Sequence, residues 1–253
     1  MKTHHQSVYQ QFDEQAAAYL TSQVHAQGED LHALQQLLQE NAEATVLDLG
    51  CGAGHASFSV APFVDSVTAY DLSDSMLSVV AATAQERALH NIKTCQGTVE
   101  SLPFEDNRFD IVISRYSAHH WHDVGRALRE VHRVLKQGGR AVFIDVVSPG
   151  HPLLDIYLQT VEVLRDTSHI RDYSVGEWTA MFNHAQLFLR TVKSFHLELE
   201  FTSWVERMRT PPPLVDAIRQ YQMTLSDEAK NYFMVQENGS FTSDVMLFEC
   251  LRP

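Results

Sequence analysis

The stretch that decides the fold is Thr45-Val46-Leu47-Asp48-Leu49-Gly50-Cys51-Gly52-Ala53-Gly54-His55. An apolar run ends at an acidic residue and a glycine-rich turn, and the segment from His55 to about Phe63 can be helical. At such a strand–loop–helix junction, backbone N–H groups and the helix dipole favour a negatively charged group. Glycines also let a ligand approach the backbone closely. The stretch therefore predicts a nucleotide-type site at the carboxyl end of the first strand of an α/β sheet.

The rest of the chain alternates strand and helix patterns. Strands are expected at 66–70, 92–96, 109–114, 140–147, within 190–201 and at about 241–250. Helices are expected over 8–39 with a break near Gly28, from Ser73 to about Leu89, from Asp123 to Gly138-Gly139, over 152–166, over 174–187 and near 214–223. This alternation is typical of βαβ units and a parallel sheet.

Length and patterning favour a single domain over residues 1–253. Its core is expected at about 42–148, 190–201 and 241–250. Cap and substrate elements are expected at about 1–40, 151–187 and 202–240.

Composition limits the class of protein. The formal net charge of −13 argues against a nucleic-acid partner, whose phosphates require Lys and Arg. No apolar run approaches the roughly 20 residues that span a bilayer, and no signal-peptide pattern follows Met1. Three cysteines without a CxxC pair are typical of reduced thiols. We expect a cytoplasmic protein without stable membrane insertion, and the oligomeric state stays open.

Two cofactors could use such a loop. The dinucleotide fingerprint is G-x-G-x-x-G, but here His55 stands where the third glycine belongs. Asp48 would repel a pyrophosphate. It would attract the ammonium and sulfonium of S-adenosylmethionine (SAM), whose carboxylate suits the backbone N–H groups. Asp71 ends the second strand and can hold ribose hydroxyls of either cofactor.

Further blocks follow in order at 97–104, 109–112 and 133–140. With them the chain resembles the class I SAM-dependent methyltransferases, in the branch of the ubiquinone and menaquinone C-methyltransferases. Within that branch it is similar to the YafE-type methyltransferases, with which it shares blocks at 114–123 and 148–152. The general pattern covers roughly 8–148. The resemblance implies a Rossmann-like, doubly wound sheet of seven strands with the last strand antiparallel. It also implies SAM as cofactor and S-adenosylhomocysteine (SAH) as product.

The resemblance also implies a cofactor site at the strand ends. The methionine part and the ribose of SAM would be bound by Asp48, Gly50, Gly52, Gly54 and Asp71. The adenine and the sulfonium would lie against Leu72, Met76, Thr98, Val99, Ser114 and Arg115. Many relatives have an acid where Thr98 stands, so Glu100 is a candidate substitute for the adenine contact.

Methyl transfer by in-line displacement relies on positioning and desolvation, and a carbon or hydroxyl acceptor must also lose a proton. His119 and His120 follow the fourth strand and are the candidate catalytic bases, because histidine titrates near neutral pH. The alternative is that one of them only packs and bonds the loop. A metal site including His122 is not favoured, since adjacent residues rarely coordinate one ion well. Quinone-type relatives carry Arg-Asn in this loop, which does not favour a quinone ring here.

The acceptor is expected to be a small organic molecule that the sequence does not name. Arg165, Arg171 or Arg207 could bind an acidic group on it, or could be solvated surface charge. A lid could be contributed by Tyr19, Ser22 and His25. The alternative function is a non-catalytic SAM-binding sensor or partner subunit. A nucleic-acid methyltransferase is disfavoured by charge and by the lack of an N/D-P-P-Y motif.

Overall fold

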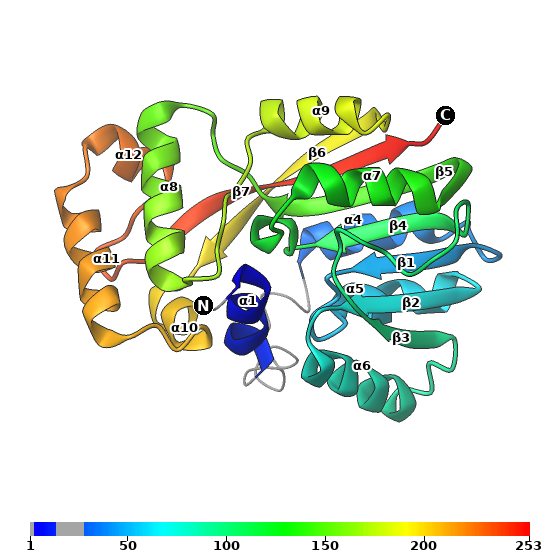
Figure 1. The fold of residues 1–253 in the computed structure, drawn as a ribbon. Coiled ribbons are helices and arrows are strands. Elements are labelled where there is room, and N and C mark those ends of the chain that lie inside the picture. Colours follow the sequence, from blue (N-terminus) through cyan, green and yellow to red (C-terminus); the bar gives the residue numbers. More distant parts are fainter. Residues whose placement is uncertain (1–2, 14–27) are drawn as a thin grey trace.

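The computed structural model describes residues 3–13 and 28–253. Within these residues the strands form one seven-stranded sheet in the order β3-β2-β1-β4-β5-β7-β6 (Figure 1). The strands are β1 (Thr45–Leu49), β2 (Ser66–Asp71), β3 (Ile92–Gln96), β4 (Phe109–Arg115), β5 (Leu135–Val146), β6 (Phe188–Leu199) and β7 (Phe241–Leu251). The first five pair in parallel, and β7 is antiparallel to both neighbours, β5 and β6. The predicted seven-stranded sheet with an antiparallel last strand is confirmed.

Helices cover both faces of this sheet and gather at one end of the molecule (Figure 1). The helices of the described residues are α1 (His4–Asp13), α4 (Glu29–Leu38), α5 (His55–Val60), α6 (Asp74–Glu86), α7 (Val124–Val134), α8 (Pro152–Arg165), α9 (Val175–His184), α10 (Phe201–Arg207), α11 (Pro212–Thr224) and α12 (Asp227–Tyr232). Neighbouring residues of β1 point to opposite faces. Val46 belongs to the apolar cluster that includes α4 and α5, and Leu47 to the cluster that includes α7 and α9.

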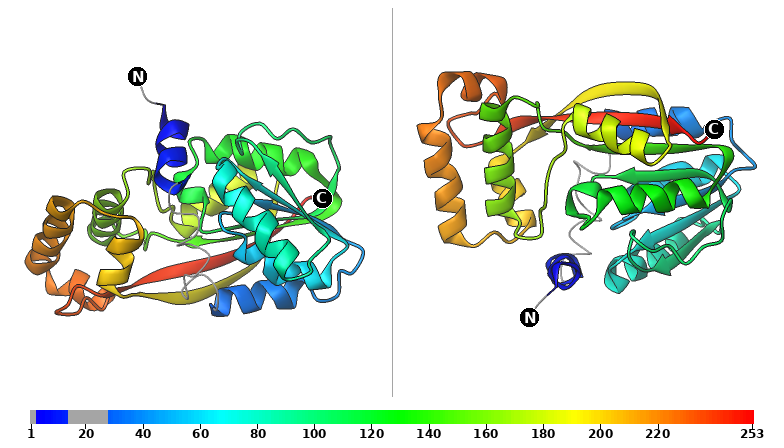
Figure 2. Two further views of the ribbon diagram at one scale, coloured as in Figure 1. Left: turned by 90° about the horizontal axis from the view of Figure 1, so that it is seen from below. Right: turned by 45° about the horizontal axis from the view of Figure 1, so that its top comes forward.

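Helices α8, α10, α11 and α12 gather at one end of the molecule, where the long strands β6 and β7 extend to meet them (Figures 1 and 2). Helix α1 lies between this group and α6, with which it is in contact. The order of the strands reverses between β1 and β4. In open α/β sheets a ligand crevice is expected at that point, outside the carboxyl ends of the strands.

One predicted helix end was wrong. Helix α7 ends at Val134, and β5 starts at the next residue rather than at Arg140. Gly138-Gly139 therefore lies inside the long β5 element, where the pairing with β4 changes register between Phe109 and Ile111. Gly138 has φ +75°, a conformation that suits an irregularity in a strand as well as a helix end.

The N-terminal helical pattern starts earlier than predicted, whereas the second helix follows Gly28, where a break was predicted. Helix α1 begins at His4, before the predicted start at residue 8, and α4 follows Gly28. Residues 14–27 lie outside the described residues. Two short helices, α10 and α12, fall in 202–240 where no helix was predicted. Pro212 and Pro213 open α11, where their missing N–H groups cost no intrahelical bond.

Candidate active site

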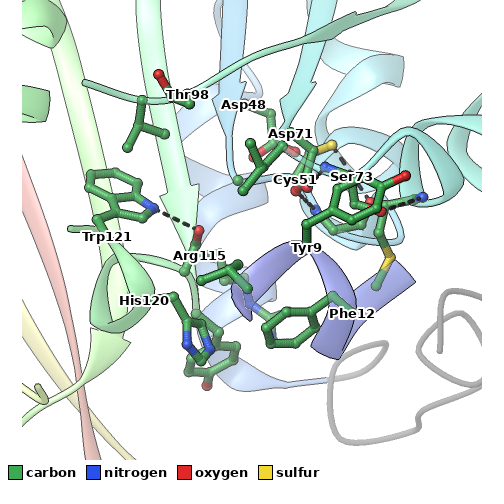
Figure 3. Close-up of a pocket in the computed structure, with 18 of the residues that line it drawn as sticks. Tyr9, Phe12, Asp48, Cys51, Asp71, Ser73, Thr98, Arg115, His120 and Trp121 are labelled. Atoms are coloured by element: carbon green, nitrogen blue, oxygen red, sulfur yellow. Dashed lines mark hydrogen bonds between the residues drawn. The ribbon is translucent and has the colours of Figure 1, made fainter. Parts of the chain in front are cut away.

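A cavity of about 1050 Å³, open to solvent, lies at the carboxyl ends of β1, β2 and β4, with α1 on one side (Figure 3). The predicted cofactor residues that line it are Asp48, Gly50, Gly52, Asp71, Leu72, Met76, Thr98, Val99, Glu100 and Arg115. Gly54 and Ser114 are described by the structure but do not line it. Helix α1 contributes His5, Val8, Tyr9 and Phe12. The expected lid residues Tyr19, Ser22 and His25 lie outside the described residues.

The loop after β1 depends on glycine for two different reasons. A Cβ on Gly50, which has φ +64°, would lie 1.8 Å from the hydroxyl oxygen of Ser117. A Cβ on Gly52, with φ +50°, would meet nothing within 4 Å. Gly54 precedes α5, and a Cβ there would meet Phe58 and Val80. Gly50 and Gly54 therefore allow close contacts inside the protein, whereas Gly52 leaves space in the cavity.

Asp48 is the most deeply buried acid of the cavity, at 1% exposure. Its Oδ2 accepts a hydrogen bond of 2.6 Å from Ser57, but its Oδ1 has no hydrogen-bond partner among the described residues. Burial, with a smaller contribution from Asp71, raises the pKa of Asp48 to about 7. A buried carboxylate oxygen without a donor is costly unless a cation or donor reaches it. The position fits the positively charged methionine part of SAM.

Asp71 joins the first two strand ends. Its Oδ2 accepts from the Gly52 N–H at 2.8 Å, and its Oδ1 accepts from the Ser73 N–H at 2.9 Å. Burial raises its pKa. Each carboxylate oxygen can accept a further hydrogen bond, so Asp71 can hold the glycine loop and ribose hydroxyls together. Ser73 caps α6 by accepting from the Met76 N–H, which fixes Met76 in the cavity wall.

The predicted adenine side is formed by the loop after β3. The backbone carbonyl of Thr98 accepts a hydrogen bond from the Tyr70 hydroxyl. Glu100 accepts through Oε1 from the backbone N–H groups of His122 and Asp123, and its Oε2 lies 3.3 Å from Nε2 of His5. Glu100 therefore connects two loops with α1, and its role at the adenine stays a prediction.

Ser114 and Arg115 end β4 and have different surroundings. The Ser114 hydroxyl is buried and donates to the backbone carbonyl of Leu49, which ties β4 to β1. Arg115 donates to both carboxylate oxygens of Asp30 on α4, at 2.5 and 3.2 Å, and its guanidinium lies over the Tyr116 ring. Asp30 was not singled out from the sequence, although it is an acid on the otherwise apolar, buried face of α4.

The two candidate histidines differ in charge. His119 Nδ1 lies 2.6 Å from Oδ1 of Asp145. Burial alone would lower the pKa of His119, but the charge and hydrogen bond of Asp145 raise it to about 9. His119 is therefore a cation at neutral pH. It does not line the first cavity, and Asp145 had not been identified from the sequence.

His120 lines the first cavity and stays neutral. Burial and the charge of His119 lower its pKa to about 4. Its Nδ1 lies 3.2 Å from the carbonyl oxygen of Ser168, an acceptor, so Nδ1 carries the proton. The Nε2 atom therefore keeps its lone pair and can accept a proton. Figure 3 shows His120 beside Phe12 at the edge of this cavity.

A second cavity, of about 600 Å³, adjoins the first, and both share Phe12, Tyr116 and His120. The remaining wall comes from the loop after β4, the end of β5, α8, the segment after α8, β6 and α10. It consists of His119, Val146, Glu162, Arg165, Asp166, Asp172, Leu197, Leu199, Trp204 and Arg207. The three arginines proposed to bind an acidic group lie in different places. Arg165 and Arg207 line the cavity, but Arg171 pairs with Asp155 and Glu177 instead.

Over residues 3–13 and 28–253 no cluster of His, Cys, Asp and Glu side chains is arranged to hold a metal ion. No helix in that same part of the chain has the length and apolar character to cross a membrane.

Comparison with known proteins agrees with this geometry. A family model described as "Methyltransferase domain" matches residues 47–143. The chain is 58% identical over 200 residues to the uncharacterised protein YafE of Escherichia coli K12, covering 79% of this chain and 97% of YafE. It is 40% identical over 246 residues to the uncharacterised methyltransferase YcgJ of Bacillus subtilis 168, covering 95% of this chain and 97% of YcgJ.

The crystal structure of YcgJ matches with a TM-score of 0.85 at 38% identity, covering 88% of this chain and 98% of that structure. A demethylmenaquinone methyltransferase of Lactococcus lactis IL1403 is 38% identical over 122 residues, which is 47% of either chain.

The sheet topology, the cavity at the strand ends and these matches define the class of protein. The chain belongs to the class I methyltransferase family. The methyltransferase domain in turn implies SAM as the methyl donor. The resemblance seen in the sequence is thus confirmed.

Proposed function

We propose that this chain transfers a methyl group from SAM to a small organic acceptor, with SAM in the first cavity and the acceptor in the second. The observation that carries this proposal is that His120, a neutral imidazole, lines both cavities. The whole chain would then act as one domain, with α1 beside both cavities and with α8 and α10 on the acceptor side.

When bound, SAM supplies an electrophilic methyl group on a sulfonium. Asp48 would compensate its positive charge through the unpaired Oδ1, and Asp71 would hold the ribose hydroxyls. Tyr9, Phe12 and Trp121 bring aromatic surface to the cavity, and removing water there strengthens electrostatic positioning.

His120 would remove the proton of the acceptor through Nε2. A general base must be within hydrogen-bond reach of the acceptor and unprotonated at the working pH. The His120 imidazole meets the second condition, whereas His119 is protonated and paired with Asp145. We assign His119 to holding this loop against β5 and to keeping His120 neutral through its charge.

The test uses purified protein, SAM with a labelled methyl group and a metabolite extract. We expect label to enter a small molecule, and His120→Gln to slow transfer by about a hundredfold or more. SAH affinity should stay unchanged in the variant.

The matched control is His122→Gln, which alters an exposed histidine of the same loop and should leave transfer unchanged. SAH binding without label transfer to any fraction would instead favour the alternative, a non-catalytic SAM-binding protein.

A further inference from the structure

The charged groups around the second cavity are unevenly paired. The buried acids are Asp145, Glu162, Asp166 and Asp172. His119 pairs with Asp145, and Arg165 pairs with Glu162 at 3.3 Å. Asp166 and Asp172, both 2% exposed, each keep one buried oxygen, Oδ2, without a hydrogen-bond partner among the described residues. Both residues line this cavity.

Each of these two unpartnered oxygens lies beside a histidine, and the charges of His119 and Arg165 also act on Asp172. Asp166 Oδ2 lies 3.9 Å from Nε2 of His120, which has a lone pair rather than a proton. Asp172 Oδ2 lies 3.7 Å from Nε2 of His169, whose proton points to the side-chain oxygen of Gln159 at 3.2 Å. Burial and the charge of His119 lower the pKa of His169 to about 2. Both imidazoles are therefore neutral.

Two acceptors thus face each other across the gap between Asp166 and His120. A donor group that approaches this pair of atoms from the cavity side would bond to both. An ammonium is the donor that also compensates buried carboxylate charge. The remaining wall, from Leu197, Leu199 and Trp204, is apolar and suits the body of a small molecule.

An acidic acceptor is not matched in the same way. Arg165 donates from Nε to the carbonyl of Trp204 and lies over the Trp204 ring, in addition to its ion pair with Glu162. Arg171 is held by Asp155 and Glu177. Arg207, at the end of α10, is the third cation that faces this region. The oxygen atoms without a partner belong to Asp166 and Asp172. Burial and the charge of Glu162 raise the pKa of Asp172. A cation bound beside it favours the ionised carboxylate, whereas an acid does not.

We propose that the acceptor is a small amine whose ammonium is bound by Asp166 and Asp172 and whose apolar part lies against Trp204 and Leu199. This inference rests on the proposed function, because it names the substrate class of the same site. It assigns Asp166 and Asp172 as specificity-determining residues.

The test compares matched ligands by calorimetry on the full chain, in the presence and in the absence of SAH. The ligands are 2-phenylethylamine and cyclohexylmethylamine, with 3-phenylpropanoate, cyclohexanecarboxylate and 2-phenylethanol as counterparts of similar shape. We expect at least one amine to bind at least about tenfold more tightly than its acid and alcohol counterparts.

Variants test the assignment to residues. Asp166→Asn and Asp172→Asn keep the side-chain shape and should each weaken amine binding about tenfold or more, with SAH affinity within about twofold of wild type. The control Asp216→Asn makes the same charge change at an exposed site on α11 and should leave amine binding unchanged.

The inference is overturned if the acids or the alcohol bind as tightly as the amines, if no amine binds, or if both Asn variants keep full amine affinity. The comparison on the wild-type chain needs no variant to fold. Failure of SAH binding would contradict the proposed function, whereas the amine series without SAH still decides the substrate class.

Discussion

At the scale of single residues, Gly50 and Gly52 provide a matched pair. Both have positive φ, so a side chain at either position costs about 1–2 kcal/mol of backbone strain. Only at Gly50 does the added Cβ also collide, with Ser117, whose hydroxyl accepts a hydrogen bond from the Trp121 indole N–H.

We predict that Gly50→Ala lowers the free energy of unfolding clearly more than the strain alone, whereas Gly52→Ala costs only about that strain. Because the Gly52 methyl group would enter the cavity, Gly52→Ala should still weaken SAH binding. Urea unfolding followed by circular dichroism measures the first effect, and calorimetry the second. Equal losses of stability, or an unaffected SAH affinity in Gly52→Ala, would show that the loop geometry is wrong.

That the predicted cofactor residues gather at one cavity could be expected from the sequence because they are local. The residues from Asp48 to Gly54 occupy one strand end and one loop, and Asp71 follows at the end of the next strand. The residues proposed for the acceptor could not be predicted in this way. Asp166 approaches His120, and Asp172 lines the same cavity, only through the path of the segment after α8, which no spacing in the sequence encodes. Asp145 could have been found in the sequence, because an acidic residue inside an apolar strand indicates that its carboxylate has a buried partner.

At the scale of elements, the carboxyl ends of β4 and β5 are joined by the pair His119–Asp145. Asp145 accepts hydrogen bonds from the Ala118 and Val146 N–H groups as well as facing His119. The pair therefore fixes the loop that carries His120.

This pair predicts a pH dependence of stability. The His119 side chain is 16% exposed, and its pKa is raised to about 9, above the roughly 6.5 of an unfolded histidine. A raised pKa means that the folded state binds the proton more tightly. The contribution, about 2–3 kcal/mol, is fully present below about pH 6.5 and is lost as the pH rises through about 9.

We expect the free energy of unfolding of wild type to fall between about pH 6.5 and 9 by more than that of His119→Gln. Urea titrations at several pH values measure the free energy of unfolding of both proteins. Subtracting the two pH profiles removes the contribution of the groups that the proteins share. Parallel pH profiles for the two proteins would mean that the pair does not form.

Element boundaries were predictable where capping residues mark them. Ser73 and Asp123 accept backbone N–H groups at the starts of α6 and α7, as their sequence positions suggested. The end of α7 could not be predicted in this way, because Gly138-Gly139 lies in an irregular stretch of β5 and not at a helix terminus.

At the scale of the whole molecule, the first cavity, in which we propose that SAM binds, lies at the strand ends, and α8 and α10 help to close the second cavity. The sheet follows from alternating apolar runs and could be read from the sequence. The second cavity arises between the loop after β4 and the elements α8, β6 and α10, and these three elements carry no motif. This explains why the methyl donor was predictable and the acceptor was not.

The most direct test of the account is a calorimetric titration of SAH into wild type, Asp71→Ala and the control Asp74→Ala, which removes an exposed acid three residues away. The account predicts one site per chain in wild type and in Asp74→Ala, and an affinity at least about tenfold weaker in Asp71→Ala. No binding of SAH to the folded wild type, or equal affinity in Asp71→Ala, would contradict it.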